Sequence, residues 1–259
     1  MYTHNNPFYF KDPSGLWSFS SIFRTICKIF AIYQGMHTGV VQDEVTLFHS
    51  SFDGSCRESY VGPNGNPSVG KIGFINRINT SNQEWHEAAG HLSKVAGGSS
   101  IGGVYSESHG ILDVLECDFL FWLSDLKSVT ELRKELIDFH ESAAPGQKYL
   151  LFAHSRGAIV AYVALKELPQ EVRERVIVRA YAPAKYIPDD FGCSVVNYKT
   201  DRDFVPWFQN LYNFFSNEKY TIQTMHSDAL FDHSFRSPTF EASIEQNINK
   251  FLNGSWNDE

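Results

Sequence analysis

The sequence predicts an α/β fold, in which a mostly parallel β-sheet is covered by helices on both faces. From residue 71 onward, short and continuously apolar runs alternate with longer segments whose apolar residues recur at helical spacing. Strands that are apolar throughout and separated by helices are typical of a parallel sheet buried on both faces. Hydrophobic residues make up 42% of the chain and charged residues 20%, which is ordinary for a globular protein with one core.

The predicted elements follow one another in βαβ order. A strand at residues 71–75 precedes a helix at 83–94 and a second strand at 101–105. The remaining predicted strands are 148–153, 176–182, 194–198 and 220–224, and the remaining helices are 127–142, 157–168 and 241–252.

A segment rich in Gly, Pro, Asn and Ser, residues 50–70, separates this pattern from the start of the chain. We therefore divide the chain into an N-terminal extension and loop, residues 1–69, and a core, residues 70–259. Within the extension, apolar residues recur at helical spacing over 16–33 and are interrupted by Arg24 and Lys28. This pattern predicts an amphipathic helix that packs on the main domain, with membrane-interface binding as the alternative. It does not predict a transmembrane span.

The overall charge excludes some classes of partner. A net charge of −8 and a pI near 5.7 give no electrostatic reason to expect binding to nucleic acid or to an anionic membrane. The cysteines lie far apart and are expected to be reduced: Cys27, Cys56, Cys117 and Cys193. No secretory signal is evident, so we expect a cytoplasmic protein, with export as an effector left open.

A candidate nucleophile follows the predicted strand at 148–153. Ser155 lies where this buried strand must turn into a helix, which is the setting of a nucleophile elbow. Ala153 and Gly157 supply the small residues that such a turn requires, although Ala153 replaces the first glycine of the G-x-S-x-G pattern. The alternative is that Ser155 only caps the helix. His154 is interpreted as a structural histidine that points into the sheet.

Acid and base candidates follow in the order expected of an α/β-hydrolase-like fold, each after a later strand. Asp203 is the predicted acid, with Asp201 as the alternative, because a carboxylate past a strand end can orient an imidazole. His233 is the predicted base because it lies in the last loop before the terminal helix. His226 is the alternative.

Further residues are expected to surround the reacting carbonyl. The backbone N–H groups of Arg156 and Arg77 are the predicted oxyanion hole, with the N–H of Ile78 as the alternative to that of Arg77. Ile78, His109 and Trp207 are candidates for substrate binding; Trp207 begins an aromatic segment, residues 207–215, that could form a lid or an acyl pocket. No metal-ligand or nucleotide-binding motif occurs, so we expect no cofactor.

Several phrases resemble those of an uncharacterised chlamydial family of α/β-hydrolase-like proteins with lipase- and esterase-like motifs. The segments are 73–79 (GFINRIN), 108–113 (SHGILD), 153–158 (AHSRGA), 182–187 (APAKYI), 202–206 (RDFVP) and 232–239 (DHSFRSPT). The resemblance spans about residues 70–252 and favours His233 over His226; Asp203 lies in a phrase like the one that carries the acid in many lipases. Arg77 stands where the family pattern has glycine.

Together these patterns predict a serine hydrolase that cleaves an ester or acyl bond of a small-molecule or lipid substrate through an acyl-enzyme. A peptidase would use the same residues. The alternative from another class is a catalytically inactive hydrolase-fold binding or effector module. The oligomeric state is left open.

Overall fold

The computed structural model describes residues 54–77, 80–107, 127–203, 218–228 and 232–256. These residues belong to a compact unit that runs from Ser51 to Glu259. The amphipathic helix predicted at 16–33 lies outside the described residues. In the part of the chain that is described, no helix is long and apolar enough to span a membrane.

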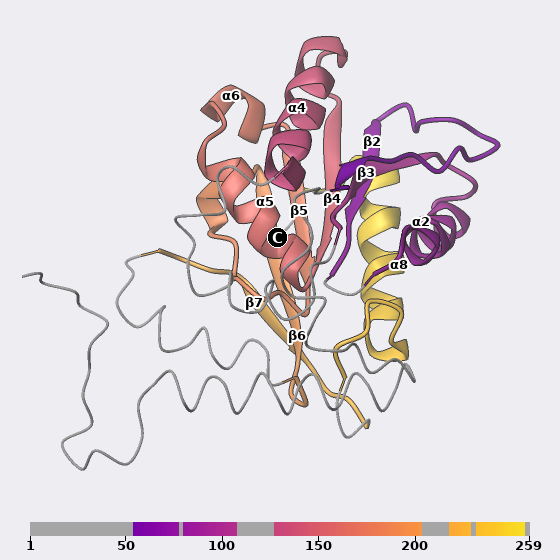
Figure 1. The fold of residues 1–259 in the computed structure, drawn as a ribbon, viewed down its shortest axis with the longest axis vertical. Coiled ribbons are helices and arrows are strands. Elements are labelled where there is room, and N and C mark those ends of the chain that lie inside the picture. Colours follow the sequence, from indigo (N-terminus) through magenta and orange to yellow (C-terminus); the bar gives the residue numbers. More distant parts are fainter. Residues whose placement is uncertain (1–53, 78–79, 108–126, 204–217, 229–231, 257–259) are drawn as a thin grey trace, which may run out of the picture. The chain divides into compact units, whose positions relative to one another are not determined.

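The centre of the unit is a seven-stranded sheet with the order β1-β3-β2-β4-β5-β6-β7 (Figure 1). Its strands are β1 (Cys56–Arg57), β2 (Gly70–Ile75), β3 (Ile101–Tyr105), β4 (Lys148–His154), β5 (Val176–Tyr181), β6 (Ser194–Thr200) and β7 (Ile222–Met225). Only the β1–β3 pair is antiparallel. The carboxyl ends of six parallel strands therefore lie along one edge of the sheet, where sites of α/β proteins form.

Four helices of the described residues lie between parallel strands: α2 (Asn82–Val95), α4 (Lys127–Ser142), α5 (Arg156–Lys166) and α6 (Gln170–Arg173). A short 3-10 turn, η3 (Asp189–Phe191), precedes β6, and α8 (Pro238–Leu252) follows the last strand. Local sequence explains where two of them begin. Ser81 and Glu84 form a capping box at the start of α2. Ser237 caps α8, and Pro238 occupies its first turn, where a missing N–H is harmless.

Each face of the sheet is covered by its own helices. Figure 1 shows α2 and α8 on one side and α4, α5 and α6 on the other. Side chains of the inner strands alternate between two apolar clusters. Thus Leu150 and Phe152 of β4 pack in the α2 and α8 cluster, whereas Leu151 and Ala153 pack in the cluster of α4 and α5. The mostly parallel, two-sided sheet confirms the predicted α/β-hydrolase-like fold.

The predicted elements within the described residues are present, with ends shifted by a few residues. Strand β1 was not predicted, because two residues inside a Gly- and Pro-rich segment carry no periodic signal. It pairs with β3, and Tyr60 forms a further bridge to Ile101, so part of the 50–70 segment belongs to the sheet. The division of the chain at residues 69 and 70 stays a proposal.

Candidate active site

Ser155 occupies the single-residue turn between β4 and α5. Its backbone has φ 53° and ψ −117°, a conformation that non-glycine residues rarely adopt. Hydrogen bonds maintain it: the Ser155 N–H donates to the carbonyl of Tyr181 at 3.1 Å, and the Ser155 carbonyl accepts from the N–H groups of Ala158 and Ala184, each at 3.0 Å. The chain around the serine is thus fixed by three neighbours.

The positions two residues before and after Ser155 have no space for larger side chains. Ala153 is fully buried in β4, between Ile75 of β2 and Ala180 of β5. A β-carbon on Gly157 would lie 2.6 Å from the carbonyl oxygen of Ile75 and 2.8 Å from that of Asn76. Backbone contacts between α5 and the end of β2 therefore require glycine at position 157, and burial between two strands favours a small residue at Ala153.

The predicted acid and base lie in hydrogen-bonding distance of this serine. His233 Nε2 is 2.7 Å from Ser155 Oγ, and His233 Nδ1 is 2.8 Å from Asp203 Oδ2. Both partners of the serine are buried, and the Asp203 side chain is fully shielded from solvent. Because a carboxylate only accepts, Nδ1 carries the proton, which leaves Nε2 as the acceptor for the serine hydroxyl. The three side chains form one continuous hydrogen-bonded line.

The two alternative residues pair with each other instead. His226 Nδ1 lies 2.7 Å from Asp201 Oδ2, and the His226 side chain is 72% exposed. The hydrogen bond to Asp201 raises the pKa of His226, and the same bond lowers the pKa of Asp201. These residues form a surface pair separate from Ser155.

Arg156 is the first residue of α5, where backbone N–H groups have no partner within the helix and can face an anion. Its side chain is buried rather than exposed. The guanidinium Nη1 donates to Ser106 Oγ at 2.7 Å and to the Glu107 carbonyl at 3.2 Å. The side chain therefore connects the start of α5 to the end of β3.

Asn76, which was not among the residues predicted from the sequence, links the end of β2 to the end of β3. Its amide group donates to the carbonyl oxygens of Arg77 and Ser106, both at 2.8 Å, and its Oδ1 accepts from the Ser106 N–H at 2.7 Å. Arg77 follows directly, and burial lowers the pKa of its guanidinium. The position of Asn76 directly after a predicted buried strand is the feature of the sequence that could have indicated this residue. The oxyanion role of the Arg77 N–H stays a prediction.

Asp232, next to the candidate base, is a second buried group that was not selected. Its Oδ2 accepts from Ser227 Oγ at 2.7 Å, Ser237 Oγ at 2.8 Å and Thr239 Oγ1 at 2.6 Å. We call these four residues the Asp232 cluster. Burial acts to raise the pKa of Asp232, but the three hydroxyl hydrogen bonds outweigh it, and the pKa is lowered. The cluster joins the loop before His233 to the start of α8.

Ile78, His109 and Trp207, the predicted substrate-binding residues, lie outside the described residues, as does the aromatic segment 207–215. No group of three or more His, Cys, Asp or Glu side chains among the described residues is arranged to hold a metal ion.

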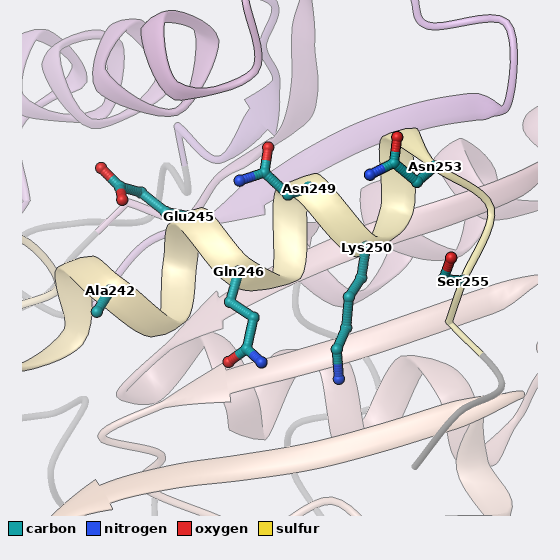
Figure 2. A pocket seen from close by; sticks show the side chains of 7 residues that line it. All are labelled: Ala242, Glu245, Gln246, Asn249, Lys250, Asn253 and Ser255. Atoms are coloured by element: carbon teal, nitrogen blue, oxygen red, sulfur yellow. The ribbon is translucent and has the colours of Figure 1, made fainter.

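A hollow of about 470 Å³ lies elsewhere, along the outer side of α8 (Figure 2). It is lined by Ala242, Glu245, Gln246, Asn249, Lys250, Asn253 and Ser255. These residues belong to α8 and the segment after it, and most are polar. None comes from the loops that carry Ser155, Asp203 and His233, so this hollow is not the cleft next to the candidate nucleophile.

A strained serine after the central parallel strand, joined to a His–Asp pair from later loops, is the arrangement used by serine hydrolases of the α/β-hydrolase type. No family model matches the chain. Over 74 residues the chain is 35% identical to methyl jasmonate esterase 1 of Vitis vinifera, and this stretch is 29% of the chain and 27% of that protein.

Similar solved structures include an arylesterase and a dienelactone hydrolase from Anabaena variabilis. The arylesterase is 11% identical with a TM-score of 0.48, and the alignment covers 93% of this chain and 94% of that one. The dienelactone hydrolase is 11% identical with a TM-score of 0.44, covering 77% and 91%. An α/β serine hydrolase homologue from Coxiella burnetii is 16% identical with a TM-score of 0.38, covering 82% and 94%.

Proposed function

We propose that this protein is a serine hydrolase that cleaves ester bonds through an acyl-enzyme intermediate. Ser155 is the nucleophile, His233 the general base and Asp203 the acid that orients it. The observation that carries the proposal is the unbroken hydrogen-bonded line from Asp203 through His233 to Ser155. A serine that only capped α5 would bond to the helix; Ser155 makes no side-chain capping bond, and its hydroxyl meets the imidazole instead.

The first half of the reaction forms the acyl-enzyme. His233 Nε2 takes the proton of the Ser155 hydroxyl as Oγ attacks the carbonyl carbon of the ester. The carbonyl oxygen becomes negatively charged, and the N–H of Arg156 at the start of α5 donates to it, with the Arg77 N–H as the proposed second donor. When this intermediate collapses, the bond from carbon to the alcohol oxygen breaks, and the imidazolium gives its proton to the leaving alcohol.

The second half restores the enzyme. Water gives a proton to His233 Nε2 while its oxygen attacks the acyl carbon, and the bond to Ser155 Oγ then breaks. The proton returns to Oγ, and the carboxylic acid departs. Asp203 stays ionised throughout and stabilises the positive imidazolium, which explains why its carboxylate is oriented towards Nδ1.

We propose a small-molecule or lipid ester with an apolar acyl part as the substrate, because the aromatic segment 207–215 directly follows the acid loop. The same residues could serve a peptidase, so amide substrates belong in the test. Membership of the chlamydial hydrolase-like family and a cytoplasmic location are predictions from the sequence.

The first test is labelling of the purified protein by a fluorophosphonate probe, followed by hydrolysis of p-nitrophenyl esters of increasing acyl length. Wild-type protein should be labelled and should turn over esters, whereas Ser155→Ala and His233→Ala should do neither above background. Ser243→Ala is the matched control: this buried serine of α8 bonds to the Phe240 carbonyl at 2.7 Å, and its loss should leave labelling intact.

Circular dichroism and thermal unfolding would establish that each variant is folded. If folded wild-type protein neither reacts with the probe nor hydrolyses any ester or amide, the proposal is wrong, and a binding or effector module of the same fold takes its place.

A further inference from the structure

His154, the last residue of β4, directly contacts the loop that carries the candidate base. Its side chain is buried, and Nε2 lies 2.8 Å from the main-chain carbonyl oxygen of His233. The centroids of the His154 and His233 rings are 5.5 Å apart, and the ring planes are inclined by 40°. The centroid of the Phe235 ring lies 5.7 Å from that of His154. His154, interpreted from the sequence as a structural histidine, thus contacts the backbone of His233.

The chemistry of this contact fixes which nitrogen of His154 carries a proton. A carbonyl oxygen can only accept, so Nε2 must carry a proton and donate it. Burial lowers the pKa of His154 well below its usual value, and the nearby charges of His233 and Arg77 lower it further. The ring is therefore neutral near pH 7, with its single proton on Nε2. A neutral donor suits this position, because His233 becomes positively charged during the proposed reaction.

The contact matters because it completes the support of the His233 backbone. The carbonyl of Asp232, in the peptide group before His233, accepts from Thr200 Oγ1 at 3.0 Å. The carbonyl of His233, in the peptide group after it, accepts from His154. Both peptide groups that flank the α-carbon of His233 are thus bound by side chains from strands β6 and β4. Fixing both groups fixes the direction in which the His233 side chain leaves the backbone.

We propose that His154 is a positioning residue for His233: its Nε2–H hydrogen bond sets the backbone from which the imidazole reaches both Asp203 and Ser155. Its effect on turnover rests on the proposed function. Its effect on the geometry of His233 does not, so the two can be tested separately.

The test uses the full chain and three variants. His154→Phe keeps an aromatic ring but removes the donor, and His154→Gln restores an N–H at a reach similar to that of Nε2. Thr239→Val is the control for stability, because it removes the Thr239 hydroxyl, which bonds to Asp232 and Ser227 in the Asp232 cluster, and leaves the His233 carbonyl untouched. Thermal unfolding would show that the compared variants are folded.

The first readout is the low-field proton resonance of the His233 Nδ1–H in hydrogen bond to Asp203, assigned with Asp203→Asn and measured without substrate. It should be present in wild-type protein, His154→Gln and Thr239→Val, and weakened or lost in His154→Phe. The second readout is ester hydrolysis. His154→Phe should lower kcat by about 10–100-fold with KM nearly unchanged, since a displaced base slows chemistry more than binding.

The inference is overturned if folded His154→Phe keeps both the resonance and the wild-type kcat. It is also overturned if Thr239→Val, at an equal loss of stability, loses the resonance to the same extent, because loop stability alone would then account for the effect. If wild-type protein has no esterase activity and no probe reactivity, the proposed function fails, and the resonance alone decides whether His154 positions His233.

Discussion

Gly157 and Ile75 meet backbone to backbone: a β-carbon on the glycine would lie 2.6 Å from the carbonyl oxygen of the isoleucine. Non-bonded carbon and oxygen atoms do not approach so closely. Ile75 ends β2 and Gly157 is the second residue of α5, so this contact sets how far the helix can lie from the strand next to Ser155.

Gly157→Ala should therefore destabilise the protein, by about 1–3 kcal/mol as measured for overpacked sites, and should also lower activity because α5 must move. Urea unfolding measures the first effect and ester hydrolysis the second. The matched control is Gly90→Ala in α2, where the nearest atom to the new β-carbon is in the Tyr60 side chain at 3.2 Å. Equal stability of Gly157→Ala and wild-type protein would contradict the close contact.

Asp203→Asn should leave the fold in place and lower kcat by about 10⁴-fold, as expected when an imidazole loses the partner that fixes its tautomer. The amide would offer an N–H to Nδ1 and draw the ring proton to Nε2, which could then no longer accept from Ser155. The measurement is kcat and KM for the preferred ester. Asp201→Asn is the control, because Asp201 pairs with the surface His226. If Asp201→Asn lowered kcat more than Asp203→Asn did, Asp201 rather than Asp203 would be the acid that orients His233.

Asp232→Asn should lower the free energy of unfolding at pH 7 by roughly 2–3 kcal/mol, since hydrogen bonds to a charged group contribute more than neutral ones. The control, Asp228→Asn, makes the same chemical change at a fully exposed side chain and should have almost no effect. Urea unfolding measures both variants.

The pH dependence of Asp232→Asn follows from the lowered pKa of the carboxyl. A carboxyl whose pKa is lowered by folding stabilises the folded state at pH values above its pKa in the unfolded chain, about 3.9. This stabilisation is lost as the pH falls through the pKa of the folded state. The difference between wild-type protein and Asp232→Asn should therefore narrow below about pH 4. A difference that stays constant down to pH 3 would contradict the hydroxyl-bound carboxylate.

Acid should destabilise the protein through His154 over a different range. The pKa of His154 is lowered on folding, so below the unfolded value of about 6.5 the unfolded chain binds a proton that the folded chain does not. The stability of the folded state is unaffected by this group above about pH 6.5. Below that pH the free energy of unfolding declines by up to about 1.4 kcal/mol per pH unit. Because His154→Gln lacks this group, its stability relative to wild-type protein should improve from pH 7 to pH 5. If the stability of His154→Gln relative to wild-type protein did not change with pH, His154 would accept a proton as readily in the folded as in the unfolded chain.

Much of the fold could be predicted because it depends on local patterns. Mostly apolar runs mark β2, β4 and β5, since strands buried on both faces carry few polar side chains. Arg179 of β5 is an exception that donates to Asn247. The turn at Ser155 could also be predicted, because a strained serine between strand and helix requires the small neighbours that the sequence shows. Strand β1 could not, because an edge strand of two residues has no period.

The contacts that support the site were less predictable, because they join residues far apart in the sequence. Nothing near Asn76 indicates that its amide bonds to Ser106, thirty residues later. Likewise His154 gives no local sign that its partner is the carbonyl of His233, seventy-nine residues away. Such polar pairs depend on which strand ends become neighbours in the sheet.

The order of the strands gives the site an uneven resistance to local opening. Ser155 follows β4, which lies in the middle of the sheet with a parallel neighbour on each side. His233 lies beyond β7, an edge strand whose residues are largely exposed. Edge strands separate at a lower free energy than central ones. Fraying of β7 should therefore loosen the chain that leads to the His233 loop, while the serine, its helix and the contacts of β6 and β4 to the His233 backbone stay in place. Amide hydrogen exchange at β7 would report how often this opening occurs.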